Sequence, residues 1–326
     1  MREVESAWAE VKPWLEGLEA RRKKAVRRFI WAIPLAIGAA VAAALVISLF
    51  GAPVELAVIG GVVLAGLLLA LGGADMRTLS KEIKEGLNTR LAEAFGLRYQ
   101  MSPAEPARYE AFRSHGLIPG CDRQSFEDHF SGEAHGADFE LYEAHLEQRR
   151  RSKNRTYYVT VFRGLLLRIA FPRTVEGVTL ITRDKGLFNA LESFSNKTFG
   201  RAGRKLDRIG LVDPRFEKLF EVYGTDQVMA RYLLTPTFME RLLDLEKLLS
   251  GKNVRAVFDE ELAVETGRGE LLIAAETGDN FEPGSLFKSL TDRTRVETLF
   301  AEIKLIDDII ATLLEPADFR AGPAGG

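Results

Sequence analysis

The sequence is short of several residues that define common classes of protein. It has 326 residues but a single cysteine, Cys121, so an intramolecular disulfide is impossible and a reducing compartment is expected. The formal net charge is only −2, which gives no global signal for a nucleic-acid partner. Charge is also missing locally, because no charged residue occurs between Phe29 and Val54. The apolar residues are therefore concentrated in one early block.

This block predicts a transmembrane helical hairpin over residues 29–73. A helix needs roughly 20 apolar residues to cross a bilayer core of about 30 Å. The run after Phe29 is long enough, and a second apolar run follows Glu55. Gly51 and Pro53 lie between the runs and indicate a tight turn. The first run begins too late and is too long for a cleavable signal peptide.

Small residues recur every four positions along both apolar runs, and we expect them to form the packing surface of the two helices. Such stripes let helix backbones approach closely in lipid. The stripe consists of Ala32, Ala36, Ala40 and Ala44 on the first helix, and of Ala57, Gly61 and Ala65 on the second.

Basic residues flank the predicted hairpin on both outer sides and are missing from its turn. The rule that loops rich in Lys and Arg stay in the cytosol therefore predicts cytosolic N- and C-termini. These residues are Arg21, Arg22, Lys23, Lys24, Arg27 and Arg28 before the first helix, and Arg77, Lys81 and Lys84 after the second. The expected location is the inner membrane of a bacterium, with multiple passes.

Two amphipathic helices flank the hairpin. Residues 1–28 form a basic N-terminal segment whose apolar face either lies on the membrane or packs on the soluble domain, and Pro13 is expected to interrupt it. Residues 74–100 have Leu, Ile or Phe every four positions and predict a stalk helix. Residues 101–124, rich in Pro at their start, are expected to form a linker.

Residues 125–314 predict a cytosolic α+β domain with an antiparallel sheet and flanking helices. Strands are expected over 138–148, 157–171, 177–182, 217–223, 254–265 and 270–276. Thr235 before Pro236 predicts a helix start, and the last helix is expected over 291–314. A pleckstrin-homology-like barrel is one arrangement with this element order. Residues 315–326 are expected to be a disordered tail.

A cluster of cations lies between the two longest predicted strands and indicates a membrane-surface site. A basic residue close to an anionic leaflet gains about 1 kcal/mol. The cluster consists of Arg149, Arg150, Arg151, Lys153 and Arg155. A second basic run contains Arg201, Arg204, Lys205 and Arg208. The alternative is a solvated turn whose charges discourage edge-strand aggregation, which is the more common role of such charges.

Three segments of the chain carry a resemblance to a known family. They are FRGLLLRIAF, the block DPRFEKLFEVYGTDQVMARYLLTPTFMERLLDL that begins at Asp213, and FEPGSLFKSL that begins at Phe281. Together they resemble the bacterial membrane family called Domain of Unknown Function 3137, over about residues 75–314. The resemblance implies two membrane helices near the N-terminus and a cytosolic domain, and it implies no activity.

No pattern in the sequence defines catalytic chemistry, a cofactor or a metal. The four histidines, His115, His129, His135 and His145, lie near Cys121, but their spacing fits no metal-ligand motif, so we interpret them as ordinary polar residues. Phosphate-binding loops and nucleophile elbows are also missing. We therefore expect a membrane-tethered interaction or scaffold module that binds a protein partner or the anionic inner leaflet. The alternative is a membrane-bound enzyme whose site the sequence does not reveal.

Overall fold

The computed structural model divides the chain into two compact units, each described by itself. One unit contains residues 1–91 and 282–301, and the other contains residues 92–281 and 302–326. The structure describes residues 2–51, 53–153, 155–171, 174–183, 206–249, 253–260 and 269–314. The expected tail at 315–326 and the basic residues Arg201, Arg204 and Lys205 lie outside these ranges.

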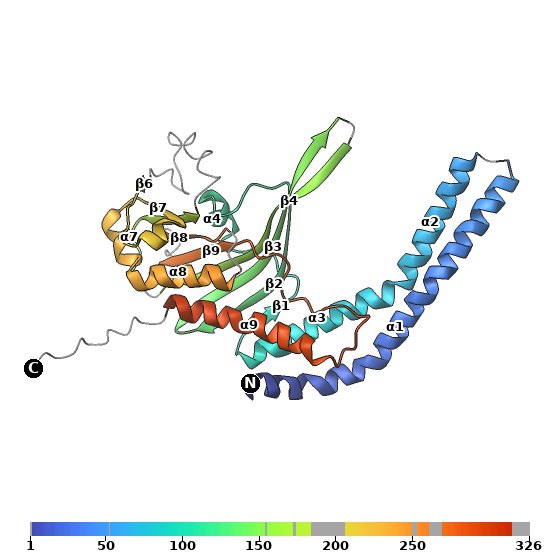
Figure 1. Ribbon diagram of the computed structural model, residues 1–326, viewed down its shortest axis with the longest axis horizontal. Coiled ribbons are helices and arrows are strands. Elements are labelled where there is room, and N and C mark those ends of the chain that lie inside the picture. The colour runs from blue at the N-terminus through green and yellow to red at the C-terminus, as the bar shows by residue number, and fades with distance from the viewer. Residues whose placement is uncertain are drawn as a thin grey trace, which may run out of the picture. The chain divides into compact units, whose positions relative to one another are not determined.

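The first unit is helical and contains the apolar hairpin (Figure 1). Helix α1 covers Arg2–Leu49, α2 covers Val54–Gly72 and α3 covers Ala74–Ala94. Two of the described helices are long and apolar enough to cross a membrane by length and composition, which bears out that part of the prediction. The expected interruption at Pro13 is wrong, because α1 continues through this residue. A proline inside a helix costs about 3 kcal/mol, and burial of Val11 and Leu15 on either side offsets it.

The N-terminal half of α1 packs inside its own unit. Its residues Val11, Leu15 and Leu18 are buried, as are Leu79, Ile83 and Leu87 of α3. Trp14 lies against Gly86, and the guanidinium of Arg90 stands 4.4 Å from the Trp14 ring centroid. This apolar face is therefore buried inside the helical unit, whereas the sequence left open the membrane surface and the soluble domain. The start of α9 (Arg293–Leu314) joins the same unit, with Val296 and Leu299 buried.

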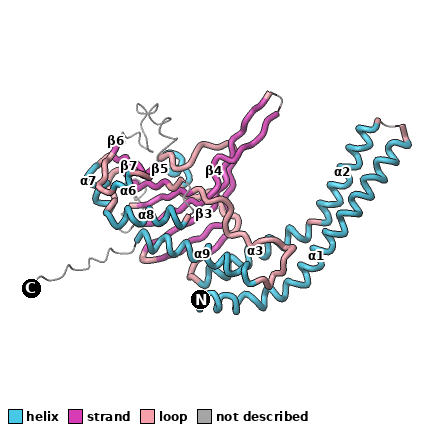
Figure 2. The backbone as a smooth tube through the Cα atoms, viewed as in Figure 1, coloured by secondary structure: helices cyan, strands magenta, loops and turns pink. Residues whose placement is uncertain are grey.

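The second unit is built on one nine-stranded sheet in which every described pairing is antiparallel (Figure 2). Its strand order is β1-β2-β3-β4-β9-β8-β5-β7-β6. The strands are β1 (Arg98–Gln100), β2 (Arg123–Ala134), β3 (Ala137–Ser152), β4 (Arg155–Ala170), β5 (Val178–Arg183), β6 (Asp207–Arg208), β7 (Phe220–Gly224), β8 (Arg255–Asp259) and β9 (Glu270–Ala275). The α+β class predicted from the sequence is confirmed.

The sheet is covered on both faces. On one face α4 (Tyr109–Ser114) packs Tyr109 and Phe112 into a cluster with Leu166 and Leu272. On the other face α8 (Pro236–Leu248) brings Phe238 to 5.5 Å from Phe258, measured between ring centroids. Thr235 caps α8 by accepting a hydrogen bond from the backbone N–H of Phe238, as the sequence predicted. Two short helices, α6 (Pro214–Glu217) and α7 (Gln227–Leu233), and residues 302–314 of α9 also belong to this unit.

Three predictions differ from the structure. The expected linker over 101–124 contains α4, because Tyr109, Phe112 and Leu117 provide enough apolar surface to join the core. The strand expected over 217–223 begins only at Phe220, because Asp213 caps a helix that includes Glu217. The described strands also form an open sheet that ends at β1 and β6, whereas a pleckstrin-homology-like barrel would close. The end of the strand expected over 254–265 lies outside the described residues.

Candidate functional site

The cations selected from the sequence lie on the far end of the β3–β4 hairpin, which extends past the neighbouring strands (Figure 1). We call residues 149–153 and 155–159 the basic ribbon. Over this stretch β3 and β4 pair only with each other. Arg149, Arg150, Arg151, Lys153 and Arg155 are all exposed. The ribbon is therefore a two-stranded extension with most of its surface open to its surroundings.

The strand register divides the ribbon side chains between two faces. Arg150 pairs with Tyr157, and Arg149 pairs with Tyr158, so the two pairs point to opposite sides. Tyr157 is 50% exposed, and Val159, two residues further on the same side, is 40% exposed. Arg155 also belongs to this side. One face of the ribbon thus combines cations with an exposed aromatic and an exposed aliphatic side chain.

The base of the ribbon is fixed by contacts with β2. The guanidinium of Arg123 stacks 3.6 Å from the ring centroid of Tyr158, and the backbone N–H of Arg149 donates to Oδ2 of Asp122, the residue before β2, at 2.7 Å. Among the described residues, none of the five ribbon cations takes part in an ion pair. The ribbon therefore presents a positive charge that the described residues do not neutralise.

In the helical unit, the small residues selected from the sequence lie between α1 and α2. Ala32, Ala36 and Ala57 are buried, whereas Ala40, Ala44 and Ala65 are partly buried. A Cβ atom at Gly61 would stand 2.6 Å from the backbone oxygen of Ala40. The backbones of α1 and α2 thus lie in close contact where these small residues face each other.

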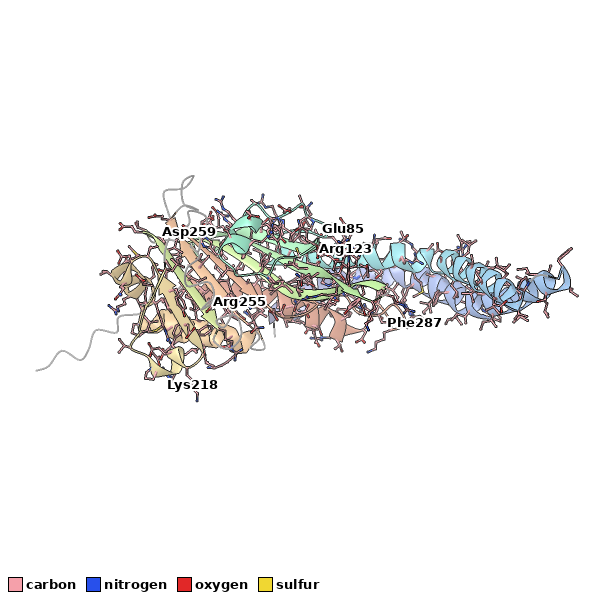
Figure 3. The ribbon with its side chains drawn as sticks, turned by 90° about the horizontal axis from the view of Figure 1, so that it is seen from above. Glu85, Arg123, Lys218, Arg255, Asp259 and Phe287 are labelled. Carbon is pink, nitrogen blue, oxygen red and sulfur yellow. The ribbon has the colours of Figure 1, made fainter. Side chains whose placement is uncertain are left out.

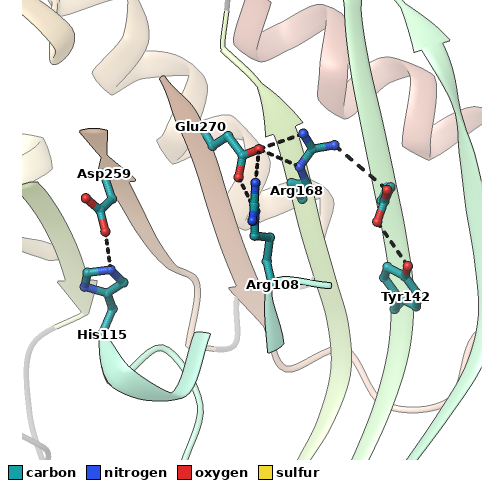
Figure 4. Close-up of polar contacts among 7 residues, drawn as sticks. Arg108, His115, Tyr142, Arg168, Asp259 and Glu270 are labelled. Atoms are coloured by element: carbon teal, nitrogen blue, oxygen red, sulfur yellow. Dashed lines mark hydrogen bonds and ion pairs between the residues drawn. The ribbon is translucent and has the colours of Figure 1, made fainter. Parts of the chain in front are cut away.

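A buried polar network that the sequence did not indicate ties the segment before α4 to the sheet (Figure 4). Glu270 on β9 is fully buried and accepts hydrogen bonds from Arg108 Nε at 2.8 Å and from Arg168 Nη2 at 2.6 Å. Arg168 also approaches Glu140, which accepts from the Tyr142 hydroxyl at 3.0 Å. Burial raises the pKa of Tyr142. The sequence signal for this network was Glu270, an acid in the otherwise apolar strand β9.

The four histidines take separate partners. His115 Nε2 lies 2.8 Å from Asp259 Oδ2, and both side chains are buried. His135 lies 3.1 Å from Asp307, and His145 lies 2.8 Å from the Thr160 hydroxyl. His129 stacks on the Tyr142 ring with 4.1 Å between centroids. Cys121 contacts the Tyr109 hydroxyl at 3.4 Å. The histidines and Cys121, which lie close together in the sequence, thus belong to different strands and loops of the structure.

A polar hollow of about 690 Å³ lies between β1 and β4 on the same face as α4. His129, Glu140 and Arg168 line it, and the exposed Arg98 stands at its rim. Within the described residues, His129 Nε2 is buried and has no hydrogen-bond partner. Burial lowers the pKa of His129, which favours the neutral ring. The hollow therefore offers a neutral imidazole and an exposed cation to a polar ligand.

The fold defines an α+β chain with two long apolar N-terminal helices and a nine-stranded antiparallel sheet. Residues 160–314 match the family described as Protein of unknown function (DUF3137), which confirms the resemblance over that range. The match begins at residue 160, so it does not extend to the earlier part of the expected range.

Comparisons with other proteins add one distant likeness. No curated protein matches the chain. Among solved structures, the chain resembles the crystal structure of the mycobacterial trehalose monomycolate transport factor A, TtfA, at 8% sequence identity. The TM-score is 0.32, and the likeness covers 72% of this chain and 97% of that chain. A likeness at this TM-score carries no functional inference.

Proposed function

We propose that this protein is a membrane-anchored interaction module of the bacterial inner membrane. Its apolar hairpin anchors the chain, and its sheet unit works on the cytosolic side. The exposure of the apolar side chains supports the anchor. Leu45 in the apolar stretch of α1 and Val63 in the middle of α2 are 62% and 66% exposed. The core helix of a soluble protein would bury such residues, whereas lipid accepts them.

The distribution of charge supports the cytosolic orientation. Basic residues cluster where α1 enters its apolar stretch and follow α2, and the described part of the turn carries none. The stretch from Phe29 to the end of α1 at Leu49 rises about 30 Å at about 1.5 Å per residue, close to the thickness of a bilayer core. Both termini of the hairpin would then face the cytosol.

The basic ribbon is the site through which the sheet unit binds the anionic inner leaflet. The single observation that carries this assignment is the set of five exposed cations without a described ion pair, next to Tyr157 and Val159. Cations supply long-range attraction to anionic lipid, and an exposed aromatic suits the headgroup region. A protein partner with an acidic surface is the competing occupant of the same site.

Vesicle flotation tests this function directly. A version of the chain lacking residues 29–73 would be mixed with phosphatidylglycerol vesicles and with neutral phosphatidylcholine vesicles. We expect flotation with the anionic vesicles at low salt and loss of flotation at high salt, because salt screens exposed charges. A chain that stays at the bottom of the gradient at low salt would remove the lipid-binding function.

A second function, that of an enzyme or small-ligand receptor, is favoured by the polar hollow beside β1. Its volume of about 690 Å³ and its convergent His129, Arg98 and Arg168 suit a small polar molecule. A thermal-shift screen of polar metabolites on the full chain tests it. A ligand that stabilises the protein but not an Arg98→Ala variant would support this second function.

A further inference from the structure

A loop in the helical unit is held in place by buried charges. The side chain of Arg22 on α1 is buried and donates from Nη1 to the Leu286 carbonyl at 2.9 Å. Glu19 pairs with Arg22 at 2.7 Å and accepts from the backbone N–H of Leu290 at 3.0 Å. Leu286 and Leu290 are themselves buried. Both ends of the segment 286–290 are therefore fixed against α1.

Helix α9 holds the start of the same loop. Arg295 donates to the backbone carbonyls of Pro283 and Ser285, the latter at 2.8 Å. The backbone N–H of Lys288 donates to the Ser285 carbonyl at 3.3 Å, which closes a turn over residues 285–288. The loop conformation is thus fixed by hydrogen bonds to its backbone carbonyls, by the Glu19–Arg22 ion pair and by the buried Leu286 and Leu290. Because the backbone is fixed, the directions of the other side chains of the loop are fixed as well.

One large apolar side chain of this loop is left outside the packed core. Phe287 is 57% exposed although its neighbour Leu286 is buried (Figure 3). Its ring centroid lies 6.3 Å from that of Phe29, the first residue of the charge-free stretch of α1. Phe29 also lies beside Gly73, directly after α2. Phe287 is therefore held where the apolar stretch of α1 begins and where α2 ends.

We propose that Phe287 inserts into the boundary between lipid headgroups and acyl chains, and that the loop forms a third membrane contact beside the helical hairpin. This inference rests on the proposed membrane anchor. Aromatic side chains are favoured at this depth, and a neighbouring lysine can keep its ammonium in the headgroup region. Lys288 is exposed next to Phe287. Trp31, 70% exposed two residues after Phe29, gives a second aromatic at the start of the apolar stretch.

Site-directed spin labelling of the full chain in anionic proteoliposomes tests the proposal. Cys121 is the only cysteine, so a Cys121→Ser background allows single labels. Labels would be placed by Phe287→Cys, by Leu45→Cys as the lipid reference and by Val228→Cys as the water reference. Leu45 is 62% exposed and Val228 is 77% exposed, so each tolerates a label. Collisions with oxygen report lipid, and collisions with a polar nickel complex report water.

The expected result is a ratio of oxygen to nickel collisions at position 287 that lies between the two references and well above that of Val228. A ratio equal to that of Val228, with Leu45 still in lipid, would overturn the proposal and leave the membrane anchor intact. An aqueous ratio at Leu45 as well would overturn both the anchor and the proposal.

Discussion

The chain contains two hairpins that extend from their own units, and they expose opposite kinds of surface. The helical hairpin α1–α2 exposes aliphatic side chains such as Leu45 and Val63, with no charge in the described part of its turn. The β3–β4 hairpin exposes five cations around its tip. Both surfaces are exposed within the described part of the chain. We propose on this basis that the first hairpin contacts hydrocarbon and that the second contacts an anionic surface.

Neutralising the basic ribbon should have the largest effect on membrane binding. Each cation near an anionic leaflet contributes about 1 kcal/mol, so replacing all five by Gln should weaken binding by roughly several thousandfold. Binding to phosphatidylglycerol vesicles at low salt would be measured for the chain lacking residues 29–73. The control is a variant with the same change in net charge among exposed cations elsewhere in the sheet unit: Arg113, Arg215, Lys218, Arg231 and Lys247.

The control should lose much less affinity than the ribbon variant. Equal losses of affinity in the two variants would mean that vesicle binding depends only on net charge. The basic ribbon would then not be a specific membrane-binding site.

Introducing one charge into each hairpin should give contrasting results. Val63→Arg places a cation at the centre of α2, where insertion loses about 2.5 to 3.5 kcal/mol. We expect a larger share of this variant to be extracted from membranes by alkaline carbonate. Tyr157→Arg puts the same residue on the ribbon and should leave the extraction unchanged. A Val63→Arg variant that resists extraction as well as the original chain would contradict the membrane position of α2.

Two glycines of α2 allow a test of the close approach between α1 and α2. Gly61→Leu would push a side chain against the Ala40 backbone, whereas Gly66→Leu meets open space because nothing lies within 4 Å of a Cβ there. Overpacking costs about 1–3 kcal/mol. The midpoint of unfolding in detergent should therefore fall for Gly61→Leu only. A similar midpoint for both variants would show that the helices are not packed at Gly61.

The sheet below the ribbon contains a buried acid whose titration should be visible. Burial raises the pKa of Glu143 to about 8, and its side-chain contact with Asp279 adds to the rise. The ordinary value is 4.5. As pH increases between these values, the unfolded chain releases the proton and the folded chain keeps it. The free energy of unfolding should therefore fall by up to about 1.4 kcal/mol per pH unit from this group.

Denaturant unfolding of Glu143→Gln at several pH values checks this. The variant should lose the decline in stability toward pH 8, whereas Glu133→Gln, which changes an exposed acid on β2, should keep it. An unchanged decline in the Glu143 variant would assign the pH dependence to other groups.

The sequence predicted those features that depend on neighbouring residues. Long uncharged runs gave α1 and α2, and the dense β-branched and aromatic run gave β4. Features that depend on distant residues were missed. Arg108 and Glu270 are separated by 162 positions, and Arg22 and Leu286 by 264. Helix α4 was missed for a local reason, since the prolines near residue 103 suggested a linker and hid the spacing of Tyr109 and Phe112.

Labelling of the two hairpin tips in intact cells tests the central claim most directly. Single cysteines would be introduced as Phe50→Cys and Lys153→Cys in the Cys121→Ser background, and cells whose outer membrane has been made permeable would be treated with a maleimide that cannot cross the inner membrane. Phe50 is 86% exposed and Lys153 is exposed, so both are open to the reagent. We predict labelling at position 50 in these cells, and at position 153 only after the inner membrane is disrupted. Labelling at position 153 with the inner membrane intact would contradict the cytosolic placement of the sheet unit.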